Sequence, residues 1–218
     1  MSDKQSSINA FAILFSTLAL IVSVLTLYLT FLSPAHLSIM AGDLVYLSHF
    51  SDKGNFSIIT PVSLTNAGSK FITVERFALL IQKPNSKEGY LLEPFSFQKL
   101  DDKGNFVADS MSAPVSIVGR SVITKGILFR SSVERPREFQ ITEPGTYELT
   151  LLAWVGDSTE PRATDSFTLV LSKEDVRNLN DYLQQHKGTT VRLPQSKWRK
   201  WAAHHLTDFE VNALRQKN

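Results

Sequence analysis

A long uninterrupted apolar segment occupies the N-terminal part of the chain. Residues 10–32 read AFAILFSTLALIVSVLTLYLTFL and contain no charged residue, proline or glycine. As an α-helix rising about 1.5 Å per residue this segment is roughly 34 Å long, enough for a hydrocarbon core of about 30 Å. A cleaved signal peptide has an apolar region of about 7–15 residues and a small-x-small cleavage site, for which SPAH at residues 33–36 is a poor match. We therefore predict a retained transmembrane helix over residues 10–32, after a short N-terminal segment, residues 1–9.

Small residues follow one side of this predicted helix. Their spacing alternates between four and three residues, and a mean repeat of about 3.5 suits a shallow left-handed helix crossing. In lipid, helices associate by close van der Waals contact and hydroxyl hydrogen bonds, so a stripe of small residues is the expected contact face. The alternative is that the hydroxyls bond back to their own helix and the alignment is accidental. This stripe, here named the small-residue seam, consists of Ala12, Ser16, Ala19, Ser23, Thr26 and Thr30.

After Pro34, which prevents helical continuation, short β-rich runs alternate with turn residues. Their spacing and the isolated glycines are typical of an antiparallel sandwich. Inward and outward positions alternate most clearly from Tyr147 to Val155 and from Phe167 to Leu171. Pro61 predicts an edge or a bend in the second run. We predict strands near residues 37–48, 56–66, 69–82, 89–98, 105–117, 121–130, 137–142, 145–156 and 163–172.

Two segments carry a resemblance to known β-sandwich families. Residues 141–157, ITEPGTYELTLLAWVGD, resemble the penultimate-strand region of immunoglobulin-like (Ig-like), fibronectin type III-like and PKD-like domains, in which a tyrosine follows a Pro-Gly turn. Residues 64–82, LTNAGSKFITVERFALLIQ, are similar to the Asn-x-Gly hairpins of many bacterial membrane-anchored sandwich domains. The resemblance implies one antiparallel Ig-like β-sandwich over residues 36–172, with Tyr147 as a structural corner bonded to upstream backbone. It carries over no catalytic residue, since such folds have many functions, and the chain lacks the cysteine pair of antibody domains.

The pentapeptide DKGNF occurs twice, at residues 52–56 and 102–106, and PVS follows each copy. Either the repeat records an internal duplication, or the same hairpin-turn chemistry is used twice, since Asp, Gly and Asn suit tight turns. We favour the second interpretation. The Asp101–Asp102 pair does not predict calcium binding, because the alternating oxygen ligands and terminal Glu of an EF-type loop are missing.

Residues 173–218 are predicted to form a short, basic, helical tail. The sequence from Ser172 to Asp175 is typical of a capping box, and the helix that it starts should end near Gly188. A second predicted helix, after Ser196, contains the densest group of cations and aromatics in the chain. This group either docks on an anionic membrane surface or a partner, or its tryptophans pack on the sandwich or on a neighbouring chain. Its members are Lys197, Trp198, Arg199, Lys200 and Trp201.

The distribution of charge predicts how the chain is oriented in a membrane, but it says little about a ligand. Lys4 and the α-amino group precede the apolar segment, and no Lys or Arg follows it until Lys53. Positive flanks stay in the cytoplasm, so we expect a single-pass signal-anchor protein of the cell membrane, in bacteria the inner membrane, with an extracytoplasmic sandwich. Residues 33–172 contain 13 basic and 15 acidic side chains. A nearly neutral domain does not indicate nucleic-acid binding.

No sequence motif for catalysis stands out. The chain has no cysteine, which excludes disulfides, thiolate metal sites and cysteine nucleophiles. Its ten glycines are scattered, so no phosphate-binding loop or nucleophile elbow is indicated. His204 and His205 are adjacent and diverge by about 100° on a helix, so they do not predict a shared zinc. We predict no catalytic, cofactor-binding or metal-binding residues and no cofactor.

The first of three functional hypotheses is a non-catalytic, membrane-anchored binding or scaffold module. Its anchor seam and sandwich would contact a second copy of the chain or another membrane protein. The second is an envelope hydrolase with a carboxylate site on the sandwich loops, which a cluster of carboxylates in one pocket would favour. The third is a cytoplasm-facing protein whose basic tail binds lipid or nucleic acid, which requires the opposite topology.

Overall fold

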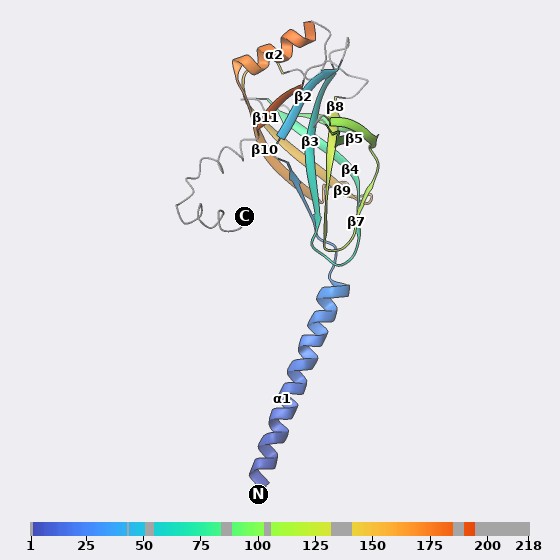
Figure 1. Cartoon of the computed structure of the whole chain (residues 1–218), viewed down its shortest axis with the longest axis vertical. Coiled ribbons are helices and arrows are strands. Elements are labelled where there is room, and N and C mark those ends of the chain that lie inside the picture. The colour runs from blue at the N-terminus through green and yellow to red at the C-terminus, as the bar shows by residue number, and fades with distance from the viewer. Residues whose placement is uncertain are drawn as a thin grey trace, which may run out of the picture.

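A computed structural model describes residues 2–42, 44–50, 55–83, 89–102, 106–131, 141–184 and 190–194. A long N-terminal helix stands clear of an antiparallel β-domain, and a short helix lies at the far end of that domain (Figure 1). The helical elements are α1 (Ser2–Leu27), η1 (Tyr28–Leu32) and α2 (Lys173–Gln184). The strands are β1 (Leu37–Ala41), β2 (Leu44–Phe50), β3 (Asn55–Asn66), β4 (Ile72–Gln82), β5 (Gly89–Leu100), β6 (Phe106–Met111), β7 (Val115–Ile117), β8 (Ser121–Arg130), β9 (Gly145–Val155), β10 (Ala163–Leu171) and β11 (Thr190–Pro194).

Helix α1 continues into η1, a single π-helical turn in which the Ser33 amide donates to the Tyr28 carbonyl at 2.9 Å. Among the described residues, Phe11–Leu32 is the one helical segment long and apolar enough to cross a bilayer, with a mean hydropathy of 2.3. None of it is buried inside the molecule. The predicted N-terminal apolar helix is therefore present.

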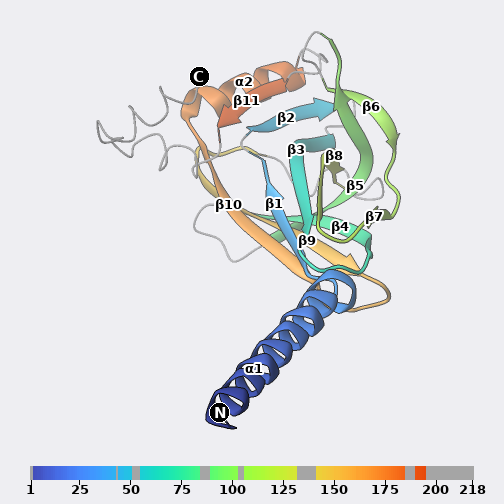
Figure 2. The same cartoon turned by 60° about the horizontal axis from the view of Figure 1, so that its bottom comes forward.

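The strands form one hydrogen-bonded path in the order β10-β9-β4-β5-β8-β3-β2-β11, with every pair antiparallel. Strand β5 joins the two halves of this path, since Leu92 pairs with β4 whereas Glu93 already pairs with β8. The sheet nearly closes on itself through β1, which lies off this path and pairs with β3, because the Ala41 amide of β1 donates to Asp165 Oδ2 of β10 at 2.8 Å. The mainly β, antiparallel prediction is confirmed. Two separate Ig-like sheets are not confirmed, and the continuous path resembles an almost closed barrel (Figure 2).

The core lies inside this nearly closed sheet. Alternate residues of β9 and β10 point inward as predicted, from Tyr147 to Ala153 and from Phe167 to Leu171. Helix α2 covers one end, with Val176 buried and Leu179 fully buried. Strand β4 is buried on both faces over Phe77–Leu79, and β5 and β9 pair with its two edges.

Two of the predicted strands are each divided into two shorter strands in the structure. The predicted strand 37–48 is interrupted after Ala41, and both parts, β1 and β2, pair with the same edge of β3. Pro61 lies between these two pairings and its carbonyl accepts from the Gly42 amide at 2.6 Å, so the predicted bend in β3 has a physical counterpart. The predicted strand 105–117 divides into β6, which pairs with β5, and β7, which pairs with β4.

The predicted Asn-x-Gly hairpin at residues 64–82 is wrong. Strand β3 pairs with β1, β2 and β8, whereas β4 pairs with β5, β7 and β9. Strands β3 and β4 do not pair, so residues 67–71 cross from one half of the sheet to the other. The buried Asn66 side chain bonds within its own connection, to Gly68 and Lys70, and also to His36 and Ile117 on other segments, so it joins the connection to neighbouring loops.

Both copies of the repeated pentapeptide fall at connections between paired antiparallel strands. Phe50 pairs with Asn55 between β2 and β3, and Leu100 pairs with Phe106 between β5 and β6. Residues 51–54 and 103–105 lie outside the described part of the chain. Hairpin connections at both places support the interpretation that the same turn chemistry is used twice.

The predicted capping box at the start of α2 is confirmed. The Asp175 amide donates to Ser172 Oγ at 3.1 Å, and the Ser172 amide donates to Asp175 Oδ2 at 2.8 Å. These reciprocal bonds satisfy two backbone donors that a helix start leaves without partners. The later part of the tail, including Lys197, Trp198, Arg199, Lys200 and Trp201, lies outside the described residues.

Candidate functional site

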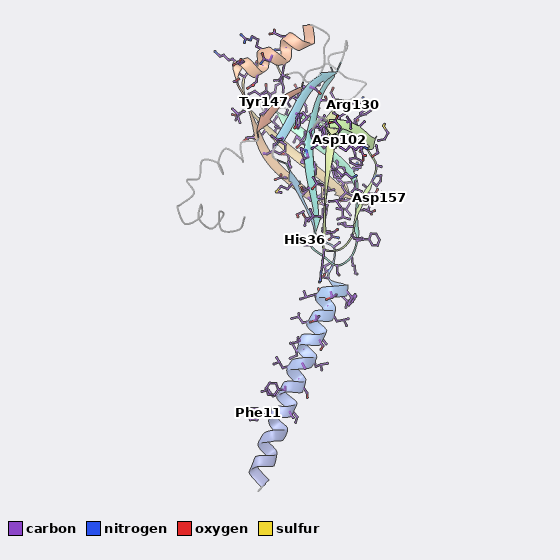
Figure 3. The ribbon with its side chains drawn as sticks, viewed as in Figure 1. Phe11, His36, Asp102, Arg130, Tyr147 and Asp157 are labelled. Atoms are coloured by element: carbon purple, nitrogen blue, oxygen red, sulfur yellow. The ribbon has the colours of Figure 1, made fainter. Side chains whose placement is uncertain are left out.

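The end of η1 meets two loops of the β-domain. One is residues 66–71, which connect β3 to β4, and the other is residues 117–121, which connect β7 to β8. The two loops are here called the base loops. His36, at the start of β1, lies at this end of the domain, whereas Tyr147 lies at the opposite end near α2 (Figure 3). The contact between helix and domain is therefore confined to the base loops and residues 33–36.

Asn66 is the centre of this junction. Its side chain is fully buried, and its Oδ1 accepts from the amides of His36 and Gly68, each at 3.1 Å. A buried polar side chain is tolerated when its donors and acceptors are satisfied. One side chain therefore holds both base loops against the segment that leaves the helix. Nδ2 donates to the carbonyls of Lys70 at 2.7 Å, Ile117 at 3.3 Å and Val118 at 3.3 Å.

A second set of bonds joins the helix end directly to the β3–β4 connection. The Ser69 amide donates to Ser33 Oγ at 3.0 Å, and the Ser69 hydroxyl donates to the Ser33 carbonyl at 2.8 Å. Gly68 is required for this close approach, since a Cβ there would lie 1.8 Å from the Pro34 carbonyl oxygen. The first residue after the helix is thus bonded to the domain, with no linker between them.

Arg120 reaches the helix itself. It is the one non-glycine residue with a positive φ in the described chain, at 56°, and the left-handed region costs such residues about 1–2 kcal/mol. Its amide donates to the Gly68 carbonyl at 2.8 Å, and its Nη2 donates to the Leu29 carbonyl within η1. The strained backbone of Arg120 is thus held by contacts to the other base loop and to the end of the apolar helix.

An open groove on the outer face of β4, β5 and β9 has a volume of about 400 Å³. The Arg76 guanidinium lies over the Trp154 ring at 5.1 Å from its centroid, and Arg76 Nη2 also donates to the Ser158 carbonyl at 3.2 Å. This surface, here the Trp154 groove, combines a cation, aromatic and apolar groups, as protein interfaces do. Other lining residues are Leu91, Glu93, Pro94 and Pro114.

A second, wider pocket of about 610 Å³ lies beside the base loops and has Phe71, Glu75 and Arg162 among its lining residues. The carboxylates that line the two pockets, Glu75 and Glu93, are solvent-exposed. Within the described ranges, no group of three or more His, Asp or Glu side chains is placed to hold a metal ion. Acid–base catalysis by carboxylates uses desolvated groups, whereas these two are open to solvent.

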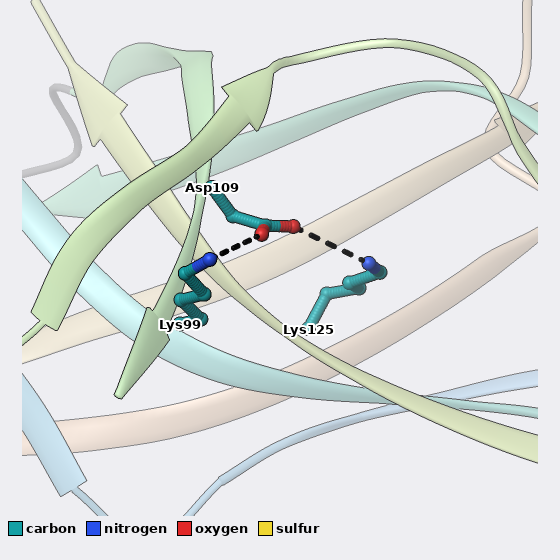
Figure 4. Close-up of polar contacts among 3 residues, drawn as sticks. All are labelled: Lys99, Asp109 and Lys125. Atoms are coloured by element: carbon teal, nitrogen blue, oxygen red, sulfur yellow. Dashed lines mark ion pairs between the residues drawn. The ribbon is translucent and has the colours of Figure 1, made fainter. Parts of the chain in front are cut away.

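Asp109 on β6 lies between two lysines on neighbouring strands (Figure 4). Its carboxylate oxygens are 3.5 Å from Lys99 Nζ on β5 and 3.8 Å from Lys125 Nζ on β8. All three side chains are at least one-third exposed to solvent. Ion pairs of this kind contribute roughly 0–1 kcal/mol each, so this cluster helps to align β6 and is not a candidate site.

Tyr147 makes the hydrogen bond expected of a corner tyrosine. It is buried, and its hydroxyl donates to the Glu143 carbonyl, four residues upstream, at 2.7 Å. Burial raises the pKa of this phenol above its usual value of 10.0. Tyr147 lies at the end of the domain far from the helix junction (Figure 3), and its burial and hydrogen bond fit the predicted corner.

We expect Tyr147→Phe to lower the free energy of unfolding at neutral pH by about 1 kcal/mol, the net value of one hydrogen bond. Because the folded-state pKa is raised, the stability linked to the neutral phenol is fully present below pH 10.0 and is lost as the pH rises through that raised pKa. The variant should therefore lose less stability in alkali than the parent does. Urea unfolding at neutral and alkaline pH measures both effects. Identical curves for parent and variant would show that the hydroxyl contributes nothing.

Two hydroxyls of the small-residue seam bond back to carbonyls of their own helix. Ser23 Oγ donates to the Ala19 carbonyl at 2.8 Å and Thr26 Oγ1 donates to the Val22 carbonyl at 2.7 Å. Thr17, which lies off the seam, bonds in the same way to the Ile13 carbonyl. Such bonds leave the hydroxyl oxygen able to accept from a neighbouring helix, so seam and back-bonding are compatible. Interhelical contact by the seam stays a prediction.

Sequence reasoning did not find the junction. Asn66 and Gly68 form an Asn-x-Gly motif, which by resemblance predicts a hairpin and not a junction. Arg120 gave no sequence signal, because its role depends on a contact across 91 residues. An Asn-x-Gly motif directly after a strand is the one signal that pointed to this place.

No protein-family model matches the chain, and no curated protein matches it. Among solved structures, the chain is similar to the lipoprotein candidate ycdA from Bacillus subtilis subsp. subtilis str. 168, at 12% identity and a TM-score of 0.38, over 71% of this chain and 42% of that one. It is also similar to an uncharacterized β-sandwich protein from Clostridium difficile 630, at 9% identity and a TM-score of 0.32, over 63% and 91% of the two chains. The chain thus spans less than half the length of the Bacillus protein. At such low TM-scores, neither likeness bears on fold or function.

Proposed function

We propose that this protein is a non-catalytic, membrane-anchored binding or scaffold module. In this proposal α1 and η1 form a retained single-pass anchor in a bacterial inner membrane. The N-terminus is cytoplasmic, and the Ig-like β-domain is extracytoplasmic. Partner proteins contact the small-residue seam within the membrane and the Trp154 groove outside it.

The observation that carries this proposal is the bonded junction between helix and domain. A signal sequence is removed from the mature protein, so bonds between it and the folded domain would serve no purpose. Here Ser69 bonds to Ser33, and Arg120 adopts a costly backbone conformation while its side chain reaches Leu29. Cleavage after Ser33 would remove both Ser33 and Leu29 from the mature chain. The junction therefore supports an apolar helix that stays attached.

The absence of a flexible linker supports a scaffold role. A domain bonded to its anchor keeps a defined distance and orientation relative to the membrane, whereas a flexible linker would let both vary. The Trp154 groove then presents its apolar Leu91, 54% exposed, and its cation–aromatic pair at a fixed place above the bilayer. A fixed binding surface pays less entropy on association than a mobile one does.

The seam predicts association of the anchor helices. We expect the double substitution Ser16→Leu and Ser23→Leu to abolish the signal of a membrane two-hybrid assay, because bulky side chains keep helix backbones apart. Substituting Leu14→Ile and Leu18→Ile, off the seam, is the matched control and should leave the signal unchanged. An unchanged signal in the Ser16 and Ser23 variant would reject the seam.

The groove predicts a partner contact outside the membrane. We expect a photocrosslinking amino acid at Leu91 to capture a defined protein in intact cells, and the same amino acid at Val170, on the exposed face of β10, to capture none. Trp154→Ala should reduce the Leu91 crosslink strongly, since truncation of a central tryptophan typically costs 2 kcal/mol or more, roughly 30-fold in affinity. Equal crosslinking at both positions would remove the groove from the proposal.

A further inference from the structure

The base loops expose apolar side chains at the end of the domain where α1 and η1 emerge. Phe71 is 74% exposed and Val118 is 68% exposed. Neither contributes to the core, although each lies next to a buried residue, Ile72 and Ile117. Exposed apolar side chains that lie together on one surface mark a site of contact with a protein or a membrane, and both of these lie on the base loops, where η1 meets the domain.

Each apolar tip has a cation beside it within its own loop, and neither loop sequence contains an acidic residue, although the exposed Glu75 lines the pocket beside Phe71. The β3–β4 connection reads NAGSKF over residues 66–71 and the β7–β8 turn reads IVGRS over residues 117–121. Each base loop thus offers one cation, Lys70 or Arg120, beside one exposed apolar residue, and both cations are solvent-exposed. Aromatic and aliphatic tips next to Lys or Arg are the composition of segments that lie in the headgroup region of a bilayer.

The contact between Arg120 and the helix fixes the depth of these loops. Arg120 donates to the carbonyl of Leu29, which belongs to the apolar segment Phe11–Leu32. At about 1.5 Å per residue, Leu29 lies about 4 Å before the last residue of that segment. If the segment spans a bilayer, a loop that touches Leu29 lies within the headgroup region. The Ser33–Ser69 and Asn66 bonds hold the second base loop at the same level.

We propose that the base loops are a membrane-contact surface, in which Phe71 and Val118 insert at the boundary between headgroups and acyl chains. Lys70 and Arg120 bind lipid phosphate groups there. A guanidinium has five donors, and its bond to Leu29 leaves others for phosphate. Three points then attach the domain to the membrane, the helix and two loops, so its tilt relative to the bilayer is fixed. This inference rests on the proposed anchoring by α1.

Spin labels test this surface without disturbing the core. The chain contains no cysteine, so single-cysteine variants of the full-length protein are labelled at one place only. Phe71→Cys and Val118→Cys report on the base loops, and Val170→Cys, at the end of β10 next to α2, is the control. The proteins are reconstituted in vesicles of phosphatidylcholine with phosphatidylglycerol. Collisions of each label with oxygen, which concentrates in lipid, and with a water-soluble nickel chelate give its depth.

We expect labels at residues 71 and 118 to favour oxygen over nickel, and the label at residue 170 to show the reverse. Lys70→Glu should shift the residue-118 label toward the nickel side, because a carboxylate is repelled by lipid phosphate, whereas Lys173→Glu, at the far end of the domain, should not. If the protein resists carbonate extraction but its labels at residues 71 and 118 are accessible to nickel, the helix is still a membrane anchor. The proposal that the base loops contact the membrane would then be wrong. If Lys70→Glu leaves the depth of the residue-118 label unchanged, the proposed role of the cations would be wrong. Release of the protein by carbonate would instead contradict the anchoring itself.

Discussion

Asn66→Ala is expected to lower the free energy of unfolding by about 4 kcal/mol, because two of the groups that it leaves without partners, the Gly68 amide and the Ile117 carbonyl, are buried and cost about 1–3 kcal/mol each. The affected groups are the amides of His36 and Gly68 and three carbonyls of the base loops. For a domain of this size such a loss lowers the unfolding temperature by roughly 10 °C. Thermal unfolding of the full-length protein in mild detergent, followed by circular dichroism, measures it.

Asn66→Asp separates the acceptor role of Asn66 Oδ1 from the donor role of its Nδ2. The aspartate has the same shape and still accepts from the His36 and Gly68 amides, but it presents an oxygen to the carbonyls that Nδ2 now contacts. We expect a loss similar to that of alanine, since a buried charge facing acceptors is unfavourable. If the aspartate variant unfolds at the parent temperature, donation to the three carbonyls has no energetic weight, and the junction is held by the amide contacts alone.

Gly68→Ala is expected to open the junction. The added Cβ would lie 1.8 Å from the Pro34 carbonyl oxygen and 2.7 Å from the Ala35 Cα, both backbone atoms that cannot rotate away. Overpacking of this kind costs about 3 kcal/mol. The chain should relieve it by moving residues 33–36 away from the base loop, which also separates Ser69 from Ser33. Distances between spin labels at Leu20 and Val122 should then change from one narrow distribution to a broad one.

Gly156→Ala is the matched control for this substitution. Gly156 has a φ of +58°, yet a Cβ there meets no atom within 4 Å. Its replacement costs about 1 kcal/mol of backbone strain and leaves the junction alone. A narrow Leu20–Val122 distribution in Gly68→Ala, equal to that of Gly156→Ala, would show that the helix and the domain are not packed as described.

Local sequence signals predicted the elements of this fold well. Residues 145–156 alternate with period two, and β9 follows them from Gly145 to Val155 with inward residues buried. The capping box at Ser172 gives the start of α2, because both partners of that motif lie within one helical turn. In each case the interaction that fixes the element lies within a few residues of the signal.

Pairing between distant strands did not follow from such signals. The sequence shows that residues 69–82 favour a strand, but not that β4 pairs with β9 instead of β3. Likewise, the Asn66–Gly68 motif is compatible with a hairpin until the Pro34 carbonyl is known to lie against Gly68. A register or a crossing between sheet halves depends on the whole hydrophobic pattern and on loop contacts, which no single segment contains.

The sequence does not predict the junction between helix and domain, for a related reason. Its energy comes from one buried amide, one close backbone approach and one strained arginine, at Asn66, Gly68 and Arg120. Each of these residue types is common in surface turns. Only their convergence on Ser33, Pro34 and Leu29 distinguishes them from ordinary turn residues.

The most direct test of the account is the intact mass of the protein that remains in carbonate-washed membranes of cells producing the untagged chain. If α1 is a retained anchor bonded to its domain, the protein stays in the membrane pellet, and its mass includes residues 2–33. Release into the wash, or a mature chain that begins after Ser33, would contradict the account, because the junction would then have lost the helix that it holds.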